Sequence, residues 1–217
     1  MIDPNLVSKP TLFKRIFNFR NTLIILIISF TVLTSFAKAY PYFGFDLAVT
    51  KIIQQYKAVW FDQLMIITSI LGNPQWAIAS TLLISVAVYL FGKKKESLMI
   101  FISSFGSIII SQFFKYVVAR PRPDGGTLDS FPSGHVMFYV SFYGFLVFLT
   151  FIFLKKNSLR TFLILILSLP IILGGVSRIY LGVHWFSDVL GAYLVGFVWL
   201  LLIIHLYQRL QVGQKDN

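Results

Sequence analysis

Long apolar runs separated by short polar stretches make up most of the chain. Six of these runs are long enough, with their flanking residues, to cross a bilayer, which takes about 20 mostly apolar residues in a helix. Their uninterrupted apolar character favours helices over the alternating pattern of barrel strands. We therefore predict an all-α, polytopic membrane protein with six transmembrane helices, at Thr22–Ala37, Gln75–Phe91, Ser97–Phe114, Gly134–Leu154, Thr161–Val176 and Phe186–Tyr207.

The stretch between the first two spans, residues 40–73, has a different pattern. Its first half carries apolar residues at helical spacing, typical of an amphipathic helix in the membrane interface: Phe45, Val49, Ile52, Ile53 and Tyr56. The run Val59–Gly72 is apolar but short and contains Asp62, which favours an interfacial or re-entrant segment over a span. We expect short interfacial helices here, ended by Asn73 and Pro74.

Composition supports a membrane protein and narrows its chemistry. Hydrophobic residues make up 57% of the 217 residues and charged residues only 12%, against about 25% charged residues in an average soluble domain. The net charge of +11 is explained by cytoplasmic anchors and an anion site rather than by a nucleic-acid partner. The absence of cysteine excludes disulfides and thiolate chemistry. No internal repeat or second domain is visible, so we predict one domain, residues 1–217.

Basic residues are distributed unequally between the two sides of this layout. Twelve of the nineteen lie on the side of the two termini: Lys9, Lys14, Arg15, Arg20, Lys93, Lys94, Lys95, Lys155, Lys156, Arg160, Arg209 and Lys215. By the positive-inside rule, the basic segment 1–20 and the C-terminus are expected in the cytoplasm, and residues 40–73 and 116–133 outside. A seventh span at Val59–Gly72 would break this rule. Ala37-Lys38-Ala39 resembles a signal-peptidase site, so a cleaved first segment is the alternative to an uncleaved span.

Candidate chemistry is concentrated between the fifth and sixth spans, in Ser177–Asp188. His184 and Asp188 are four residues apart, so on a helix they share a face and the carboxylate can orient the imidazole. Arg178 is a permanent cation with a planar fork that suits phosphate. Taken alone, the stretch is equally well explained by an interfacial histidine and a snorkelling arginine.

Two further stretches fall on the same predicted side. Lys115 is followed after six residues by Arg122 and Pro123, and Pro132-Ser133-Gly134-His135 opens the fourth span. Taken alone, they are two snorkelling cations with a proline-rich turn, and an ordinary helix start capped by Ser. The six-span layout brings both stretches and Ser177–Asp188 to the outer face, which favours a common function.

The cations and the helix start have the chemistry of a phosphate site. Phosphoryl transfer spreads charge over the phosphoryl oxygens and needs fixed positive partners. The candidates are Lys115, Arg122 and Arg178, together with the free backbone N–H groups at Ser133 and Gly134.

The two histidines add the chemistry of bond cleavage. His184, neutral and oriented by Asp188, is a candidate nucleophile that forms a phosphohistidine. His135, protonated, is a candidate acid for the leaving group and then a base for water. The scheme needs no cofactor and no metal; a zinc site of two His and one Asp is disfavoured because the nearby cations would repel the metal.

The chain resembles the type-2 phosphatidic acid phosphatase family of membrane lipid phosphatases through a complete three-part signature: Lys115-x6-Arg122-Pro123, Pro132-Ser133-Gly134-His135 and Ser177-Arg178-x5-His184-x3-Asp188. The resemblance implies a metal-independent phosphatase of lipid phosphate monoesters or diphosphates. It implies His184 as nucleophile, His135 as acid and base, and cations that hold phosphate. The soluble vanadium haloperoxidases share this signature, but the chain is too apolar to be soluble.

The substrate is less defined than the chemistry. The small size resembles bacterial family members of the plasma membrane that act on phosphatidylglycerophosphate, and undecaprenyl diphosphate is the alternative substrate. Phosphoryl transfer to another lipid or sugar is a further alternative within the enzymes. From another class, a non-catalytic binder of anionic lipids would need the three cations but has no use for the histidine pair.

Three polar residues stay outside the predicted site. His205 is interpreted as a packing residue of the last span, Arg120 as a contact to lipid head groups, and Asp62 as an interfacial residue.

Overall fold

The computed structural model describes residues 18–212, and all regular structure in this range is helical. The helices are α3 (Phe19–Ala39), α4 (Gly44–Gln54), α5 (Val59–Leu71), α6 (Pro74–Leu90), α7 (Lys94–Val118), α8 (Gly134–Phe153), α9 (Ser158–Tyr180) and α10 (Phe186–Val212). The expected all-α class is confirmed. Most of the basic segment 1–20 lies outside the described residues, as does Lys215.

Five helices are long and apolar enough to cross a membrane: α3, α7, α8, α9 and α10. A sixth span results when α5 and α6, which are bent by 64° at the break between them, are taken as one. Asn73 and Pro74 lie at this break, with the proline in the first turn of α6, where its missing N–H costs no helical hydrogen bond. The count agrees with the predicted six spans, and the second of them is one limb of a bent pair.

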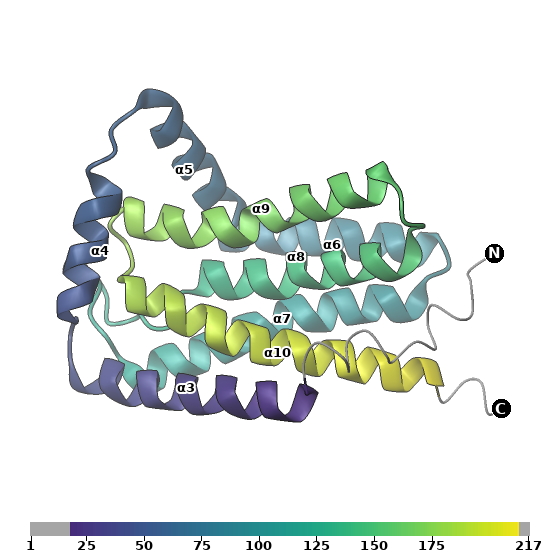
Figure 1. Ribbon diagram of the computed structural model, residues 1–217, viewed down its shortest axis with the longest axis horizontal. Coiled ribbons are helices and arrows are strands. Elements are labelled where there is room, and N and C mark those ends of the chain that lie inside the picture. The colour runs from purple at the N-terminus through teal and green to yellow at the C-terminus, as the bar shows by residue number, and fades with distance from the viewer. Residues whose placement is uncertain (1–17, 213–217) are drawn as a thin grey trace.

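α8 is the central helix, packed against α7, α9 and α10 (Figure 1). Its sequence is apolar on all faces, which is typical of a helix surrounded by other helices, and Val136, Met137 and Tyr139 are fully buried. Close packing requires small partners: a Cβ built on Gly174 of α9 would lie only 2.1 Å from the Tyr139 ring. The packed surroundings of α8 hold its first turn at a defined depth in the bundle.

The helix ends that carry the signature meet at one end of the bundle (Figure 1). α7 and α9 finish at this end, and α8 and α10 begin there. Because α7 and α9 run on beyond the apolar runs to Val118 and Tyr180, Lys115 and Arg178 lie in their last turns rather than in loops.

α4 lies across this end of the bundle and packs against α9 and α10 (Figure 1). Its buried or half-buried positions recur at i, i+3, i+4, i+7 and i+8: Asp46, Val49, Thr50, Ile53 and Gln54. Three residues of the expected apolar stripe are largely exposed: Phe45, Ile52 and Tyr56. The predicted helix is present, but only Val49 and Ile53 of its apolar stripe lie on the face that packs on the other helices.

Candidate active site

The link between α9 and α10 brings His184 next to Arg178. The Arg178 carbonyl accepts hydrogen bonds from the backbone N–H groups of Val183 at 3.2 Å and His184 at 3.3 Å. Gly182 in this link has a φ of +71°, in the left-handed region that glycine adopts without a steric penalty. The turn therefore places His184, which precedes α10, beside Arg178 in the last turn of α9.

His184 and Asp188 form the expected pair, although not on a continuous helix face. α10 begins at Phe186, so Asp188 lies in its first turn and His184 precedes the helix. Asp188 Oδ2 accepts a hydrogen bond from the Trp185 backbone N–H at 2.8 Å and lies 3.6 Å from His184 Nδ1. Both side chains are buried. Since Nδ1 faces the carboxylate, Nε2 is the nitrogen available to a substrate.

The surroundings of His184 favour its neutral form. Burial lowers the pKa of the imidazole, because the charged ring loses its solvation. Asp188 acts in the opposite direction, and the positive charges of Arg178 and Arg122 lower the pKa further. A neutral imidazole keeps a lone pair on Nε2, as nucleophilic attack requires.

Lys115 and Arg122 meet at the carboxylate of Asp129. Arg122 Nε and Nη2 donate to its two oxygens at 2.7 and 2.9 Å, and Lys115 Nζ donates to Oδ2 at 3.4 Å. Partial burial raises the pKa of Asp129, but hydrogen bonds from Arg122 and Thr127 outweigh this effect and hold that pKa well below its usual range. An ionised carboxylate thus lies where two of the predicted phosphate ligands converge.

Unpaired polar groups lie at Arg178 and at the start of α8. Arg178 Nη1 donates to Ser69 Oγ, but Arg178 Nε and the Ser133 hydroxyl are buried without a hydrogen-bond partner within residues 18–212. Because buried polar groups are normally hydrogen-bonded, both are suited to binding an anion. A Cβ built on Gly134 would lie 3.8 Å from Lys115 Nζ, so the helix start and this cation are neighbours.

His135, in the first turn of α8, is held by Asn73. Its Nε2 lies 3.0 Å from Asn73 Oδ1, which leaves Nδ1 for proton transfer. Asn73 is the N-cap residue of α6, yet its side chain makes no capping hydrogen bond. The groups whose charges act on His135 are Lys115, Arg122, Arg178 and His184.

The elbow between α5 and α6, residues 68–73, forms one wall of the site. The Thr68 carbonyl accepts a hydrogen bond from the Tyr139 hydroxyl, Ser69 contacts Arg178, and Asn73 contacts His135. A Cβ built on Gly72 would lie 2.6 Å from His135 Cδ2. The sequence indicated an interfacial or re-entrant segment here, and nothing in its pattern showed that the segment reaches the site.

The residues predicted from the sequence all lie at this end of the bundle: His184, His135, Asp188, Lys115, Arg122, Ser133, Gly134 and Arg178. Their contacts and mutual electrostatic interactions fit one common site. Their individual roles stay predictions.

Arg120 is not a head-group contact, so its interpretation from the sequence is wrong. Its side chain is buried and donates to Asp188 Oδ1 at 2.6 Å and to Asp46 Oδ2 at 3.1 Å. The Ser130 hydroxyl donates to Asp188 Oδ2. In the sequence, an arginine between Ala119 and Pro121 looks the same whether it faces lipid or the interior. Its partner Asp46 is 74 residues away in the chain.

The other two residues set aside have structural contacts. The ring of His205 stacks on that of Phe19 with centroids 4.9 Å apart, which confirms a packing role. Asp62 of α5 accepts a hydrogen bond from the Tyr180 hydroxyl of α9, so it joins two helices near the site.

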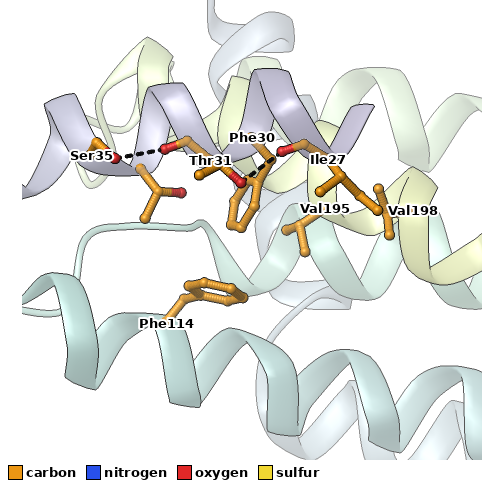
Figure 2. Close-up of a pocket in the computed structure, with 8 residues that line it drawn as sticks. Ile27, Phe30, Thr31, Ser35, Phe114, Val195 and Val198 are labelled. Atoms are coloured by element: carbon orange, nitrogen blue, oxygen red, sulfur yellow. Dashed lines mark hydrogen bonds between the residues drawn. The ribbon is translucent and has the colours of Figure 1, made fainter. Parts of the chain in front are cut away.

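An apolar groove of about 330 Å³ lies between α3, α7 and α10 (Figure 2). It is lined by Ile27, Phe30, Thr31, Thr34, Ser35, Phe114, Val195 and Val198. The hydroxyls of Thr31 and Ser35 return to carbonyls of their own helix at 2.9 and 3.0 Å, as the dashed lines in Figure 2 show. The groove contains none of the predicted site residues and no titratable side chain.

Comparison with known proteins places this arrangement in a family. The PAP2 superfamily matches residues 96–211, just over half of the chain, a range that includes every predicted site residue. The chain belongs to the PAP2 superfamily. The family expected from the sequence is thereby confirmed, and with it the enzyme class, a lipid phosphatase.

The individual relatives share low sequence identity with this chain. The chain is 26% identical over 166 residues to phosphatidylglycerophosphatase B of Bacillus subtilis (strain 168). The aligned region covers 73% of this chain and 81% of the relative. The crystal structure of a transmembrane PAP2 type phosphatidylglycerolphosphate phosphatase from Bacillus subtilis is similar with a TM-score of 0.75 and 23% identity, over 87% of this chain and 96% of that one. The structure of Aquifex aeolicus LpxE is similar with a TM-score of 0.60 and 21% identity, over 75% and 96% of the two chains. These likenesses confirm the fold.

Proposed function

We propose that this lipid phosphatase hydrolyses phosphatidylglycerophosphate through a phosphohistidine at His184. The observation that carries the proposal is the buried pair of His184 and Asp188 beside the cations Arg178 and Arg122. A binder of anionic lipids would need the cations but not an oriented imidazole, so the pair favours an enzyme over a binder.

The first step is attack by His184 on phosphorus. The lone pair of Nε2 forms the P–N bond while the P–O bond to the lipid breaks, and the leaving oxygen takes a proton from His135. The charge on the phosphoryl oxygens is balanced by Lys115, Arg122 and Arg178, and by hydrogen bonds from Ser133 and the Gly134 N–H.

The second step is hydrolysis of the phosphohistidine. His135, now neutral, takes a proton from water while the water oxygen bonds to phosphorus and the P–N bond breaks. Inorganic phosphate leaves, His184 is neutral again, and His135 is protonated for the next cycle. The residues of the chain supply the nucleophile, the acid and the base, so the reaction proceeds without a metal or a cofactor.

The choice of substrate rests on the relatives. A 26% identical protein, of which 81% is covered, is named phosphatidylglycerophosphatase B, which supports phosphatidylglycerophosphate as the substrate of this chain. Undecaprenyl diphosphate, which the sequence resemblance left open, is the competing substrate in the experiment below.

We further propose that residues 1–217 form one domain of a bacterial plasma membrane, with the site outside and both termini in the cytoplasm. Support comes from basic residues at the end of the bundle opposite the site, in the connections between α6 and α7 and between α8 and α9 and in the first turn of α7: Lys93, Lys94, Lys95, Lys155 and Lys156.

Phosphate release by the detergent-purified protein tests the function. Phosphatidylglycerophosphate, phosphatidic acid and undecaprenyl diphosphate are compared in the presence of a chelator, and we expect the first to be turned over with the highest kcat/KM. A preference for the diphosphate would reassign the substrate. Activity that is lost with chelator and restored by zinc or magnesium would overturn the metal-free mechanism.

Replacing the nucleophile tests the mechanism. We expect His184→Ala to abolish phosphate release, because the remaining site has no group to form the covalent intermediate. His205→Ala is the matched control, since it removes an imidazole that stacks on Phe19 at the other end of the bundle. Unchanged turnover by folded His184→Ala protein contradicts the phosphohistidine.

A further inference from the structure

We propose that Arg120 is a positioning residue of the hydrolytic reaction, which holds Asp188, and through it the His184 imidazole, by a buried bridge to Asp46 of α4. The inference rests on the proposed role of His184 as nucleophile. It assigns a function to the one arginine of the polar loop that the three-part signature does not include.

The first support is the geometry of the guanidinium group. Arg120 Nη1 donates to Asp188 Oδ1 at 2.6 Å and to Ser187 Oγ at 2.7 Å, and Nη2 donates to Asp46 Oδ2 at 3.1 Å. Nε donates to the Pro41 carbonyl at 3.1 Å. The planar fork of arginine can make these contacts in several directions at once, whereas the single ammonium group of lysine cannot.

The second support is burial. The side chains of Arg120, Asp46 and Asp188 all have a relative exposure of 0%. A buried charge without a partner is strongly destabilising, so the removal of one of these side chains would leave its partners buried without a counter-charge. The guanidinium also lies over the ring of Phe43, with its Cζ atom 4.8 Å from the ring centroid. Arg120 is therefore a fixed part of the interior.

The third support is that the two carboxylate oxygens of Asp188 have different partners. Oδ1 accepts from Arg120, whereas Oδ2 accepts from the Ser130 hydroxyl and the Trp185 N–H and faces His184 Nδ1. With both oxygens engaged, the carboxylate cannot rotate about its bond to Cβ. Its Oδ2 atom, and with it the imidazole of His184, is held in one orientation.

Asp46 makes α4 part of this arrangement. Its Oδ1 accepts from the Ser187 N–H at 2.8 Å, and its Oδ2 accepts from the Ser187 hydroxyl at 2.8 Å and from Arg120. The first turn of α10, which carries Asp188, is thus tied to α4 by side chains as well as by packing. A helix expected only to lie in the membrane interface contributes to the orientation of the proposed nucleophile.

Arg120 acts through Asp188 and has no contact with substrate in this proposal, because its fork is enclosed. We therefore expect its replacement to lower kcat and to leave substrate binding intact. Loss of a group that orients a metal-binding histidine costs about 10- to 100-fold in activity, and we expect an effect of the same order here. Loss of a direct phosphate ligand would instead raise KM and weaken inhibition by inorganic phosphate.

The experiment compares Arg120→Lys and Arg120→Gln with Asp46→Asn and the control Gln54→Ala. Gln54 also ties α4 to the bundle, through hydrogen bonds to the Ile179 and Tyr180 carbonyls, but it has no contact with Asp188. We expect kcat to fall about 10- to 100-fold in both Arg120 variants and less in Asp46→Asn. KM and the inhibition constant for inorganic phosphate should stay unchanged, and Gln54→Ala should keep its kcat.

Each outcome supports or overturns the positioning role of Arg120. If Arg120→Gln does not fold, Arg120→Lys, which keeps the charge but not the fork, remains the test. A kcat of folded Arg120→Lys equal to that of Gln54→Ala, or a loss confined to KM, overturns the positioning role. His184→Ala, measured in the same assay, separates the two proposals. If the Arg120 result is negative and His184→Ala is inactive, only the positioning role fails. If His184→Ala retains turnover, the proposed function itself fails.

Discussion

At the scale of single residues, the Asp129 carboxylate contacts two of the proposed phosphate ligands. Its carboxylate makes a two-pronged contact with Arg122 and a weaker one with Lys115, which are the contacts expected of a phosphoryl group. The side chain is 39% exposed, so solvent screens the pair and each interaction is worth at most about 1 kcal/mol. A substrate phosphate, with more charge, can therefore displace it.

Asp129→Asn tests this competition. Removing the negative charge frees the two cations, so we expect inorganic phosphate to inhibit more strongly, with an inhibition constant up to about fivefold lower, the equivalent of about 1 kcal/mol. Asp124→Asn is the control, because Asp124 lies in the same loop and accepts a hydrogen bond from the Gly126 N–H. A higher inhibition constant for Asp129→Asn would mean that the carboxylate holds the cations in place for phosphate.

The protonation of His184 can be followed directly. Its pKa is lowered, so the neutral imidazole should persist below pH 6.5, where an ordinary histidine is half protonated. As pH falls from 8, His184 should therefore take up its proton at a lower pH than a free imidazole does. Histidine-labelled protein in detergent, studied by NMR with His135 and His205 variants for assignment, gives the titration curve. A midpoint for His184 at or above pH 6.5 contradicts the expected direction.

Residues of the linear signature could be predicted, and their supporting partners could not. Lys115, Arg122 and His184 stand at fixed spacings that identify them without a structure. Arg120 and Asp46 are paired across 74 positions, and each is a single charged residue in an ordinary polar context. Pairing between distant segments depends on how the helices pack, which a single sequence does not record.

At the scale of elements, apolar periodicity located the helices but not the face by which each one packs. In a soluble protein the apolar stripe faces the core. α4 instead turns Asp46 and Gln54 inward and leaves Phe45 and Ile52 exposed, because apolar side chains are equally well solvated by lipid. The break at Asn73 and Pro74 was predicted, but the pairing of α5 and α6 as one bent span was not, since the short run Val59–Gly72 has the length of an interfacial segment.

The α5–α6 elbow gives a prediction at this scale. In Gly72→Ala the new Cβ would lie 2.6 Å from both His135 Cδ2 and the Tyr139 hydroxyl, and Tyr139 is fully buried. The backbone of Gly72 has a φ of −95°, so the substitution adds a contact and no backbone strain. Because His135 must move, we expect kcat to fall on the order of 100-fold.

Gly44→Ala at the start of α4 is the matched control for the elbow. A Cβ there meets nothing within 4 Å, and we expect parental kcat. Phosphate release and thermal unfolding are measured for both proteins. Equal kcat in the two variants would show that the elbow does not restrain His135.

At the scale of the whole molecule, the two ends of the bundle differ in chemistry. One end carries the site and the polar loop, and the other carries lysine-rich connections, such as Lys155 and Lys156 between α8 and α9. Basic residues in short connections are retained in the cytoplasm during insertion. The proposed outward site follows from this asymmetry, and an outward site acts on lipid phosphates that are exposed in the outer leaflet.

The absence of cysteine from the chain makes the orientation directly measurable. Leu128→Cys in the loop beside the site and Lys156→Cys at the other end each introduce a single thiol at an exposed position. In intact cells, a membrane-impermeant maleimide should label the first variant, and the second only after permeabilisation. Labelling in the reverse pattern would put the site in the cytoplasm. The lysine-rich connections would then lie outside, against the positive-inside rule, and the enzyme would act on lipids of the inner leaflet.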